Sequence, residues 1–589
     1  MEPNPEEGEF LTTVRQPFTE IGRFAVRTLM QRSEEPNLPT VQALFSTQLI
    51  VRSSVRVLDE ARVPSKPPSV QALWNSRIVL KKETLIMPFQ TESIRPKYHY
   101  TPRRNFMNDP NGLVFFDGRF LMFHQYHPEG NEWGHVSWKQ AESADLVNWT
   151  HLPVAIAEED GVMAFSGSAF ADESNSGGFG KDASPVLVAM YTGHRSADEM
   201  ESPCLAYSLD QGTTWSKYKE NPVLPWEKDF RDPKVFRHEG TARWIMVIVK
   251  ASEKRAVFFS SLNLKDWELL SSFGPEGAAA DSIANWECPD IFPLPIEGSP
   301  GQFRWVLHIG VGEGHPNGGS GGQYFVGEFD GKRFINDNPC DLTLWSDYGK
   351  DNYAAISWSG AEGPLNEKYW VGWMSNWQYA EKVPTSPWRN GLTLPRLLSL
   401  RRTEKGLRLI QRPIPALKTL RSSPTVHTSI TIPDSEFVDL EMNAGVALEI
   451  EAEFDAGDAT EFGLAVRVGE NERTFIGVDR TKGEIYVDRS RSGEGVSFSK
   501  SFLGRHSAPA TNLSGKVRLH VFVDSGSVEV FAMDGEVVLT ELIFPKPESG
   551  GLCAYSIGGQ AVLTRLAMWK LKSAKATYCE NEETDGESE

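Results

Sequence analysis

Cysteine is scarce in this chain, with five residues in 589, and their wide spacing includes no Cys-x-x-Cys pair. Nothing in this pattern suggests a zinc or dithiol redox centre, and it rules out a disulfide-stapled fold, although not a single disulfide. Long apolar runs are also missing, since no stretch approaches the roughly 18 residues that a membrane-spanning helix needs. We therefore expect a protein that does not use a membrane as its partner.

The first residues lack the features of a secretory signal. The segment MEPNPEEGEFLTTVRQPF has acids where a signal peptide has positive charge, and no apolar stretch of roughly 7–15 residues follows it. On this basis we expect a cytoplasmic protein. The alternative is a secreted protein with a wrongly assigned start, in which case the sequons at Asn148 and Asn512 become available for glycosylation.

Positive charge is in deficit, because 60 Lys and Arg stand against 79 Asp and Glu, which gives a formal net charge of −19. This balance argues against nucleic acid or an anionic membrane surface as a partner and suits a neutral ligand. Aromatic residues and glycine are abundant, with 17 Trp, 32 Phe and 50 Gly. Such a composition favours short strands, tight turns and surfaces that stack against sugar rings.

Composition and periodicity divide the chain into five segments. Residues 1–94 are rich in Arg, Ser, Pro and Glu, which predicts a largely disordered extension. Residues 95–411 contain runs of 4–8 apolar residues bounded by Gly, Asp and Asn, which is an all-β pattern. A linker over 412–439 precedes cleanly alternating strands over 440–574, which indicate a β-sandwich with one solvated face. The acidic tail, 575–589, is expected to be disordered.

Internal repeats sharpen the prediction for the first β region. A Ser–Asx turn that leads to Trp recurs in SADLVNW, SLDQGTTW and SLNLKDW. A second motif, a polar residue that opens a strand, recurs at Asp109, Ser166, Asp232, Glu287 and, more weakly, near Asn352. Five units of about 60 residues, each a set of short antiparallel strands, predict a five-bladed β-propeller followed by the sandwich. The alternative is two ordinary sandwiches with accidental similarity.

The second repeat has a chemical consequence. In a propeller the innermost strand of every blade starts at the same end of the channel, so Asp109, Asp232 and Glu287 would converge at one mouth. Proteins seldom bring like charges together without a task, although each acid could instead cap a turn by itself. No cluster of His or Cys accompanies the acids, and no calcium-binding loop pattern is present. We expect neither a metal nor another cofactor, and glycoside hydrolysis is the remaining use for such carboxylates.

Several motifs resemble those of glycoside hydrolase family 32, the family of invertases, inulinases and levanases. They are NFMNDPNGL at 105–113, FSGSAF at 165–170, FRDPKVF at 230–236, WECPDIF at 286–292 and GWMSNWQYAEKVPTSPWR at 372–389. The resemblance covers about residues 95–572, and it implies the same propeller and appended sandwich. It departs from the family at Phe106, where Trp is commoner; both provide an apolar wall.

The resemblance also implies roles. Asp109 matches a catalytic nucleophile, Glu287 a general acid/base, and Asp232 a residue that stabilises the transition state, with Arg231 beside it to keep its carboxylate ionised. Other positions match the substrate pocket: Asn108, Gln125, Trp133, Ser166, Arg231 and Trp373. We expect Trp377, in the same run as Trp373, to belong to the core.

The function implied is that of a β-fructofuranosidase, which removes terminal β-fructofuranosyl units from sucrose, inulin or levan with retention of configuration. One alternative is a fructosyltransferase that uses the same fructosyl-enzyme. Another is an inactive carbohydrate-binding protein, although all three acids are present. The expected partner is a small-molecule or oligosaccharide substrate, and a homodimer through the sandwich domain is a further expectation.

Overall fold

The computed structural model describes residues 92–578, together with two short strands near the N-terminus, and has three gaps: 182–183, 278–283 and 494–497. The two strands, β1 (Thr13–Arg15) and β2 (Gln48–Ile50), pair antiparallel within a unit separate from the one that starts at Ile86. The remainder of the extension predicted to be disordered, and the acidic end from 579, lie outside the described residues.

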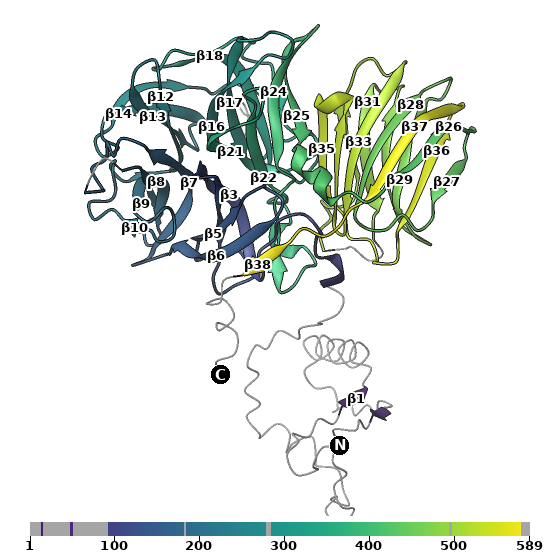
Figure 1. Ribbon diagram of the computed structural model, residues 1–589, viewed down its shortest axis with the longest axis horizontal. Coiled ribbons are helices and arrows are strands. Elements are labelled where there is room, and N and C mark those ends of the chain that lie inside the picture. Colours follow the sequence, from purple (N-terminus) through teal and green to yellow (C-terminus); the bar gives the residue numbers. More distant parts are fainter. Residues whose placement is uncertain are drawn as a thin grey trace, which may run out of the picture. The chain divides into compact units, whose positions relative to one another are not determined.

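Five sets of four antiparallel strands form the blades of the propeller, and the first and fifth blades are joined into one sheet through their innermost strands (Figure 1). Blade 1 holds β3 (Asn105–Phe116), β4 (Arg119–Tyr126), β5 (Ser137–Ser143) and β6 (Trp149–Ile156). Blade 2 holds β7 (Val162–Asp172), β8 (Val186–Arg195), β9 (Met200–Ser208) and β10 (Ser216–Lys217). Blade 3 holds β12 (Phe230–His238), β13 (Arg243–Lys250), β14 (Arg255–Ser261) and β15 (Glu268–Phe273).

Blade 4 holds β16 (Trp286–Pro295), β17 (Phe303–Val311), β18 (Gly321–Phe329) and β19 (Phe334–Asn336). Blade 5 holds β21 (Tyr353–Glu362), β22 (Lys368–Trp373), β24 (Arg396–Thr403) and β25 (Gly406–Pro413). Three further short strands pair with strands of the blades: β11 (Glu227–Lys228) with β9, β20 (Leu344–Trp345) with β18, and β23 (Trp388–Arg389) with β3. The innermost strands contact one another in the order β3, β7, β12, β16, β21, and a parallel bridge from Ser359 to Val114 closes the ring.

The repeated Ser–Asx turn joins the third and fourth strands of the first three blades. In each turn the serine hydroxyl accepts a backbone N–H: Ser143 from Leu146 at 2.8 Å, Ser208 from Gly212 at 2.8 Å and Ser261 from Leu264 at 2.9 Å. The hydroxyl therefore satisfies the turn backbone, as short polar side chains commonly do. The repeat seen in the sequence thus marks equivalent positions of three blades.

Every innermost strand breaks its pairing with the next strand at a similar depth. The register shifts lie between Met107 and Pro110, Phe165 and Gly167, Arg231 and Lys234, Glu287 and Asp290, and Tyr353 and Ile356. Such bulges turn side chains out of the regular alternation, and they occur often beside active sites. The three acids are not strictly equivalent, because Asp232 lies within its bulge whereas Glu287 lies just before its own.

Two six-stranded sheets form the sandwich (Figure 1). The first contains β26 (Thr425–Ile432), β37 (Ala561–Lys570), β28 (Leu448–Asp455), β33 (Lys516–Asp524), β34 (Ser527–Ala532) and β35 (Val537–Leu542). The second contains β27 (Phe437–Glu441), β36 (Gly551–Ile557), β29 (Glu461–Val468), β30 (Arg473–Asp479), β31 (Glu484–Arg491) and β32 (Arg505–Pro509).

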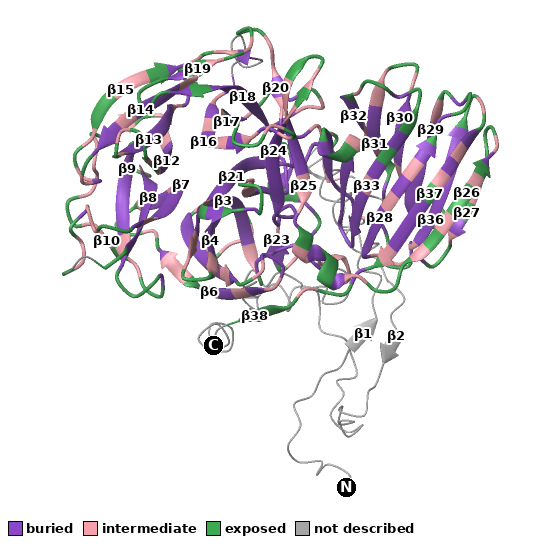
Figure 2. Ribbon diagram, turned by 45° about the horizontal axis from the view of Figure 1, so that its top comes forward, coloured by how far each residue is buried: buried purple, intermediate pink, exposed green. Residues whose placement is uncertain are grey.

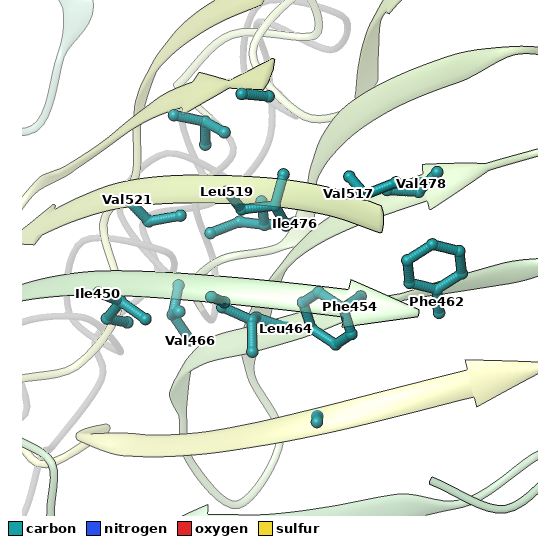
Figure 3. Packing of buried hydrophobic residues seen from close by; sticks show 14 of the residues in the cluster. Ile450, Phe454, Phe462, Leu464, Val466, Ile476, Val478, Val517, Leu519 and Val521 are labelled. Atoms are coloured by element: carbon teal, nitrogen blue, oxygen red, sulfur yellow. The ribbon is translucent and has the colours of Figure 1, made fainter. Parts of the chain in front are cut away.

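Alternate residues of both sandwich sheets point inward and pack into one apolar core (Figure 3). Ile450 and Phe454 from β28 meet Leu464 and Val466 from β29, and Leu519 from β33 lies beside them. These positions are fully or almost fully buried. The inward and outward alternation that predicted the sandwich is therefore the alternation that fills its core.

The predicted segment boundaries need two corrections. The interval 412–439 contains β26 and the start of β27, so the sandwich begins before residue 440. Its first strand has only one buried side chain, Ile432, and this polar exterior hides the strand in the sequence. The predicted tail contains β38 (Ala576–Tyr578), which pairs in parallel with β6 of blade 1.

Helical structure in the described part of the chain is limited to short 3₁₀ turns: η2 (Glu92–Ile94), η4 (Ala380–Lys382), η5 (Pro415–Leu420) and η6 (Met533–Gly535). A search of the same residues finds no helix with the length and apolarity to cross a membrane. The cysteines that the structure describes are all free, and Cys204, Cys288 and Cys553 are buried.

Candidate active site

A cleft of about 260 Å³ opens where the innermost strands of the propeller begin. Asp109 comes from β3, Asp232 from β12 and Glu287 from β16, so three blades bring the predicted acids together. The cleft is lined by Asn108, Asp109, Gln125, Trp133, Phe165, Glu201, Arg231, Asp232, Glu287 and Trp377. Aromatic side chains and charged groups in one concave site suit a polar ligand with apolar faces, such as a sugar.

Asp109 is held by a chain of hydrogen bonds that joins three of the predicted pocket residues. Asn108 donates from Nδ2 to Oε1 of Gln125 at 2.6 Å, and Gln125 donates from Nε2 to Oγ of Ser166 at 2.6 Å. Ser166 in turn donates to Oδ2 of Asp109 at 2.7 Å, while Asn108 donates to Oδ1 at 3.2 Å. Both carboxylate oxygens are therefore fixed in direction before a ligand arrives.

Burial dominates the titration of Asp109. It raises the pKa of Asp109 to about 6; the hydrogen bond from Ser166 opposes this rise, and the negative charge of Glu287 adds to it. The thiol of Cys288 also lies 3.5 Å from Oδ2 of Asp109. The carboxylate is thus ionised at neutral pH but close to the pH at which it takes up a proton.

Asp232 does not have the environment predicted for it. Its Oδ2 accepts the backbone N–H of Cys288 at 2.8 Å, and its own N–H donates to Oγ1 of Thr192 at 2.7 Å. Burial raises the pKa of Asp232 to about 8, and the charge of Arg231 opposes the shift without cancelling it. The expectation that Arg231 keeps this acid ionised is therefore wrong, because burial outweighs the charge of Arg231.

Glu287 accepts hydrogen bonds at both carboxylate oxygens. Arg231 donates from Nη2 to Oε1 at 3.0 Å, and the hydroxyl of Tyr353 donates to Oε2 at 2.5 Å. Burial raises the pKa of Tyr353 well above its usual value, and the charge of Glu287 adds to that rise, so the phenol keeps its proton. Arg231 and Tyr353 together orient the carboxylate toward the cleft.

Glu201, on β9, is the second anionic partner of Arg231. Its Oε2 accepts from Nη1 of Arg231 at 3.1 Å, and its Oε1 lies 3.2 Å from Nδ1 of His194. Burial lowers the pKa of Arg231, but the charges of Glu287, Glu201 and Asp232 more than offset this and raise it. The guanidinium stays charged and is shared between Glu201 and Glu287, with Asp229 at a longer 3.6 Å from Nη1.

Aromatic side chains form one wall of the cleft. Trp133 is 39% exposed and meets Phe165 edge-on, with ring centroids 5.7 Å apart. Phe165 is stacked on His194 at 4.3 Å, which holds it from behind. An exposed indole beside a fixed aromatic ring presents an apolar surface to a ligand.

The two tryptophans of the 372–389 run exchange the places predicted for them. Trp373, expected in the pocket, is fully buried at the end of β22 against Phe106, and it does not line the cleft. Trp377, expected in the core, lines the cleft and contacts Trp373 with ring centroids 4.8 Å apart. Trp373 supports the wall from behind, because it contacts both Phe106 and Trp377.

Four residues of the site were not predicted as such: Phe165, Glu201, Tyr353 and Trp377. A signal existed for Phe165, which precedes Ser166, and for Tyr353, which opens the fifth repeat. The sequence carries no such signal for Glu201, because this residue lies on the third strand of its blade, outside the repeat that marks the innermost strands.

Sequence comparison supplies the family. Residues 99–413 match "Glycosyl hydrolases family 32 N-terminal domain" and residues 416–570 match "Glycosyl hydrolases family 32 C terminal". The chain belongs to glycosyl hydrolase family 32. It is therefore a glycoside hydrolase, and the two matched regions correspond to the propeller and the sandwich.

Relatives in this family span most of the chain. It is 45% identical over 494 residues to a levanase of Bacillus subtilis, which covers 83% of this chain and 72% of the relative. It is 38% identical over 515 residues to an extracellular exo-inulinase of Aspergillus awamori, covering 81% and 95%. The crystal structure of exo-inulinase from Aspergillus awamori superimposes with a TM-score of 0.76 at 36% identity, over 82% of this chain and 98% of the other.

A structure of β-fructofuranosidase from Schwanniomyces occidentalis complexed with fructosyl-erythritol has a TM-score of 0.75 at 30% identity, over 83% of this chain and 99% of the other. The family resemblance inferred from NDPNG, FRDP and ECPD is thus confirmed, and so is the all-β fold of propeller and sandwich.

Proposed function

We propose that this family 32 hydrolase releases terminal non-reducing β-D-fructofuranosyl residues from sucrose and from the fructans inulin and levan. The names of its relatives, a levanase, an exo-inulinase and a β-fructofuranosidase, support this substrate class. The observation that carries the proposal is the meeting of Asp109, Asp232 and Glu287 in one cleft beside Trp133 and Trp377.

In the first step, the carboxylate of Asp109 attacks the anomeric carbon of the fructosyl unit. The carbon–oxygen bond to the leaving group breaks, and Glu287 gives a proton to the departing oxygen. The product is a fructosyl ester on Asp109. The chain of donors through Asn108, Gln125 and Ser166 suits Asp109 for this role, because it fixes the attacking oxygen.

In the second step, Glu287 removes a proton from water, and the oxygen of that water attacks the anomeric carbon and displaces Asp109. Two displacements at one carbon retain its configuration. Positive charge develops on the sugar in both transition states, and the carboxylate of Asp109 stabilises it as it attacks in the first step and departs in the second. Asp232 lines the same cleft, and we assign it to bind sugar hydroxyls and not to transfer a proton.

Product analysis tests this function and separates it from transfer. With sucrose, hydrolysis yields glucose and fructose in equal amounts at all sucrose concentrations. Kestose-type trisaccharides as the main product at high sucrose would instead assign the chain as a fructosyltransferase. Intact sucrose in the presence of a folded protein would indicate a carbohydrate-binding protein.

Two further expectations stay proposals. A homodimer formed through the sandwich domain is tested by sedimentation of the full chain at several concentrations. A cytoplasmic location is tested by fractionating the native source and treating the active fraction with an endoglycosidase.

A further inference from the structure

The outer face of one sandwich sheet carries aromatic side chains where a solvated face is expected to be polar. Phe437 on β27 lies opposite Tyr555 on β36, while Phe475 on β30 and Tyr486 on β31 continue the cluster across the sheet. Phe475 meets Tyr555 edge-on with ring centroids 5.1 Å apart, and Phe437 lies 6.0 Å from both rings. We call Phe437, Phe475, Tyr486 and Tyr555 the aromatic cluster.

These rings border a cavity of about 310 Å³, which is larger than the catalytic cleft of about 260 Å³. The lining residues come from five strands, β27, β29, β30, β31 and β36, and from the loop that precedes β27. Apolar rings with a few polar groups around them are the usual composition of a small-molecule site.

The floor of this cavity is rigid. A Cβ atom on Gly477 would lie 2.1 Å from the hydroxyl oxygen of Tyr555 and 2.4 Å from Cζ of Tyr486, so only glycine lets both rings lie down against the sheet. The two hydroxyls bond to each other at 2.5 Å, and Tyr486 also donates to Glu461. The guanidinium of Arg505 lies 3.4 Å from the centre of the Tyr486 ring.

The rim of the cavity is open to solvent. Phe437 is 49% exposed and Ile557 is 47% exposed, at the edge where Figure 2 shows exposed segments on β27. The charged groups of the lining are all carboxylates, Glu436, Glu461 and Asp488, of which Glu461 is paired with Arg505. Exposed apolar surface rimmed by hydrogen-bond acceptors matches a ligand with C–H faces and many hydroxyl donors.

Charge argues against a second copy of this chain as the occupant. The chain has a formal net charge of −19, so two copies repel each other, and the two cations beside the cluster, Arg473 over Phe437 and Arg505 over Tyr486, are already engaged with this chain's own rings. A neutral polyhydroxylated chain has no such penalty. Its ring faces can stack on Phe437 and Phe475 while its hydroxyls donate to Glu436 and Asp488.

We propose that this hollow on the sandwich is a second, non-catalytic sugar site that binds a fructan chain. The choice of fructan rests on the proposed function, whereas the hollow itself belongs to a separate domain. A polymer held there stays near the enzyme while the propeller removes units from chain ends, because binding at two places raises the effective concentration.

Isothermal titration of the full chain with an inulin-type tetrasaccharide tests this site. A Glu287→Gln background stops hydrolysis, and we expect two binding sites per chain. Adding Phe437→Ala and Phe475→Ala is expected to leave one, with an unchanged cooperative unfolding transition. The matched control is Val426→Ala, a 52% exposed apolar residue on β26 in the other sheet, which is expected to retain two sites.

A stoichiometry of one in the Glu287→Gln background, or of two in the aromatic variant, would overturn the proposal. A change from dimer to monomer on removing the two rings would also overturn it and would assign the hollow to self-association. Should the two rings prove necessary for folding, Ile557→Ala alone is expected to weaken the second site. Failure of the proposed function is distinct, since it shows as no hydrolysis of sucrose by the unmodified chain.

Discussion

At the scale of single residues, the cleft holds Asp109 close to its point of protonation. Only the ionised carboxylate attacks, and burial raises its pKa to about 6. We therefore expect kcat/KM for sucrose to fall as the pH drops through about 6, because kcat/KM reports the free enzyme. Ser166→Ala removes a hydrogen bond that lowers the pKa of Asp109, so the acidic limb should move to higher pH.

The pH–rate profiles of the unmodified chain and of Ser166→Ala measure this prediction. An acidic limb at the same pH in both would mean that a group other than Asp109 limits the rate. The direction of the pH effect depends on the role of the group. A nucleophile becomes inactive below its pKa because it is protonated there, whereas a group needed in its protonated form becomes inactive above its pKa.

Glu201 shows how a residue outside the reaction can act on it. Arg231 is shared between Glu201 and Glu287 at 3.1 and 3.0 Å. Glu201→Gln keeps the shape but removes one charge, so Arg231 pairs more strongly with Glu287 and the proton transfer from Glu287 is weakened. We expect kcat for sucrose to fall about tenfold, the effect of about 1.4 kcal/mol, with a smaller change in KM.

Glu201→Asp, which retains the charge, is the matched control and should lose less activity than Glu201→Gln. Steady-state kinetics of both variants give kcat and KM separately. A rise in KM with unchanged kcat would show that Glu201 only binds substrate and does not position Arg231.

At the scale of elements, the loop that carries Trp377 depends on the sandwich. The hydroxyl of Tyr379 donates to Asp351 at 2.6 Å and accepts from Arg489 of β31 at 2.9 Å. Arg489 also pairs with Asp351 at 2.5 Å and with Glu541 at 2.9 Å, all fully buried. Sandwich residues thus fix the loop that closes one wall of the cleft.

Arg489→Met is therefore expected to leave Asp351 buried without its cation and Glu541 with His506 alone. We expect the free energy of unfolding to fall by about 3–5 kcal/mol, the usual effect of breaking a buried pair. KM for sucrose should rise as the loop loosens. The matched control, Arg518→Met, removes a 58% exposed arginine paired with Asp534 and should cost less than about 1 kcal/mol. Denaturant titration gives the free energy of unfolding of each variant, and steady-state kinetics give its KM. Equal losses of stability in the two variants would contradict the claim that Arg489 holds the loop in place.

The elements also show what the sequence can predict. The Ser–Asx turns and the polar residues that open strands recur at blade spacing, so the five blades and the meeting of the acids follow from the repeats. Which of Trp373 and Trp377 faces the cleft cannot be predicted from the sequence. Both lie in one aromatic run, and they differ only in that Trp373 is the last residue of β22 whereas Trp377 follows it. The polar strand β26 and the partner Glu201 gave no repeat or apolar pattern by which to find them.

At the scale of the whole molecule, the segment 95–100 joins propeller to sandwich. Asp524 accepts the backbone N–H of Lys97 at 2.7 Å, and His99 lies 2.7 Å from Asp524 and 2.8 Å from Glu529. Burial lowers the pKa of His99, but its two carboxylate partners more than offset this and raise it to about 9. The imidazolium is therefore the counter-charge of two buried acids.

Two truncations test whether His99 holds the propeller and the sandwich together. Deleting residues 1–90 should leave sucrose hydrolysis unchanged, because every residue of the cleft lies beyond Asn105 and His99 is kept. Deleting residues 1–100 removes His99 and should lower the unfolding temperature, since Asp524 loses its imidazolium partner and Glu529 keeps only Arg396. A folded but inactive product of the first deletion would show that the extension completes the cleft.

The central claim is that Asp109 performs the chemistry in a cleft built by three blades. Turnover of sucrose by Asp109→Asn tests it most directly, with Asp117→Asn on the exposed turn between β3 and β4 as the matched control. The same chemical change should lower kcat by several orders of magnitude at Asp109 and leave it unchanged at Asp117, with both proteins folded. A near-native rate for Asp109→Asn would contradict the account.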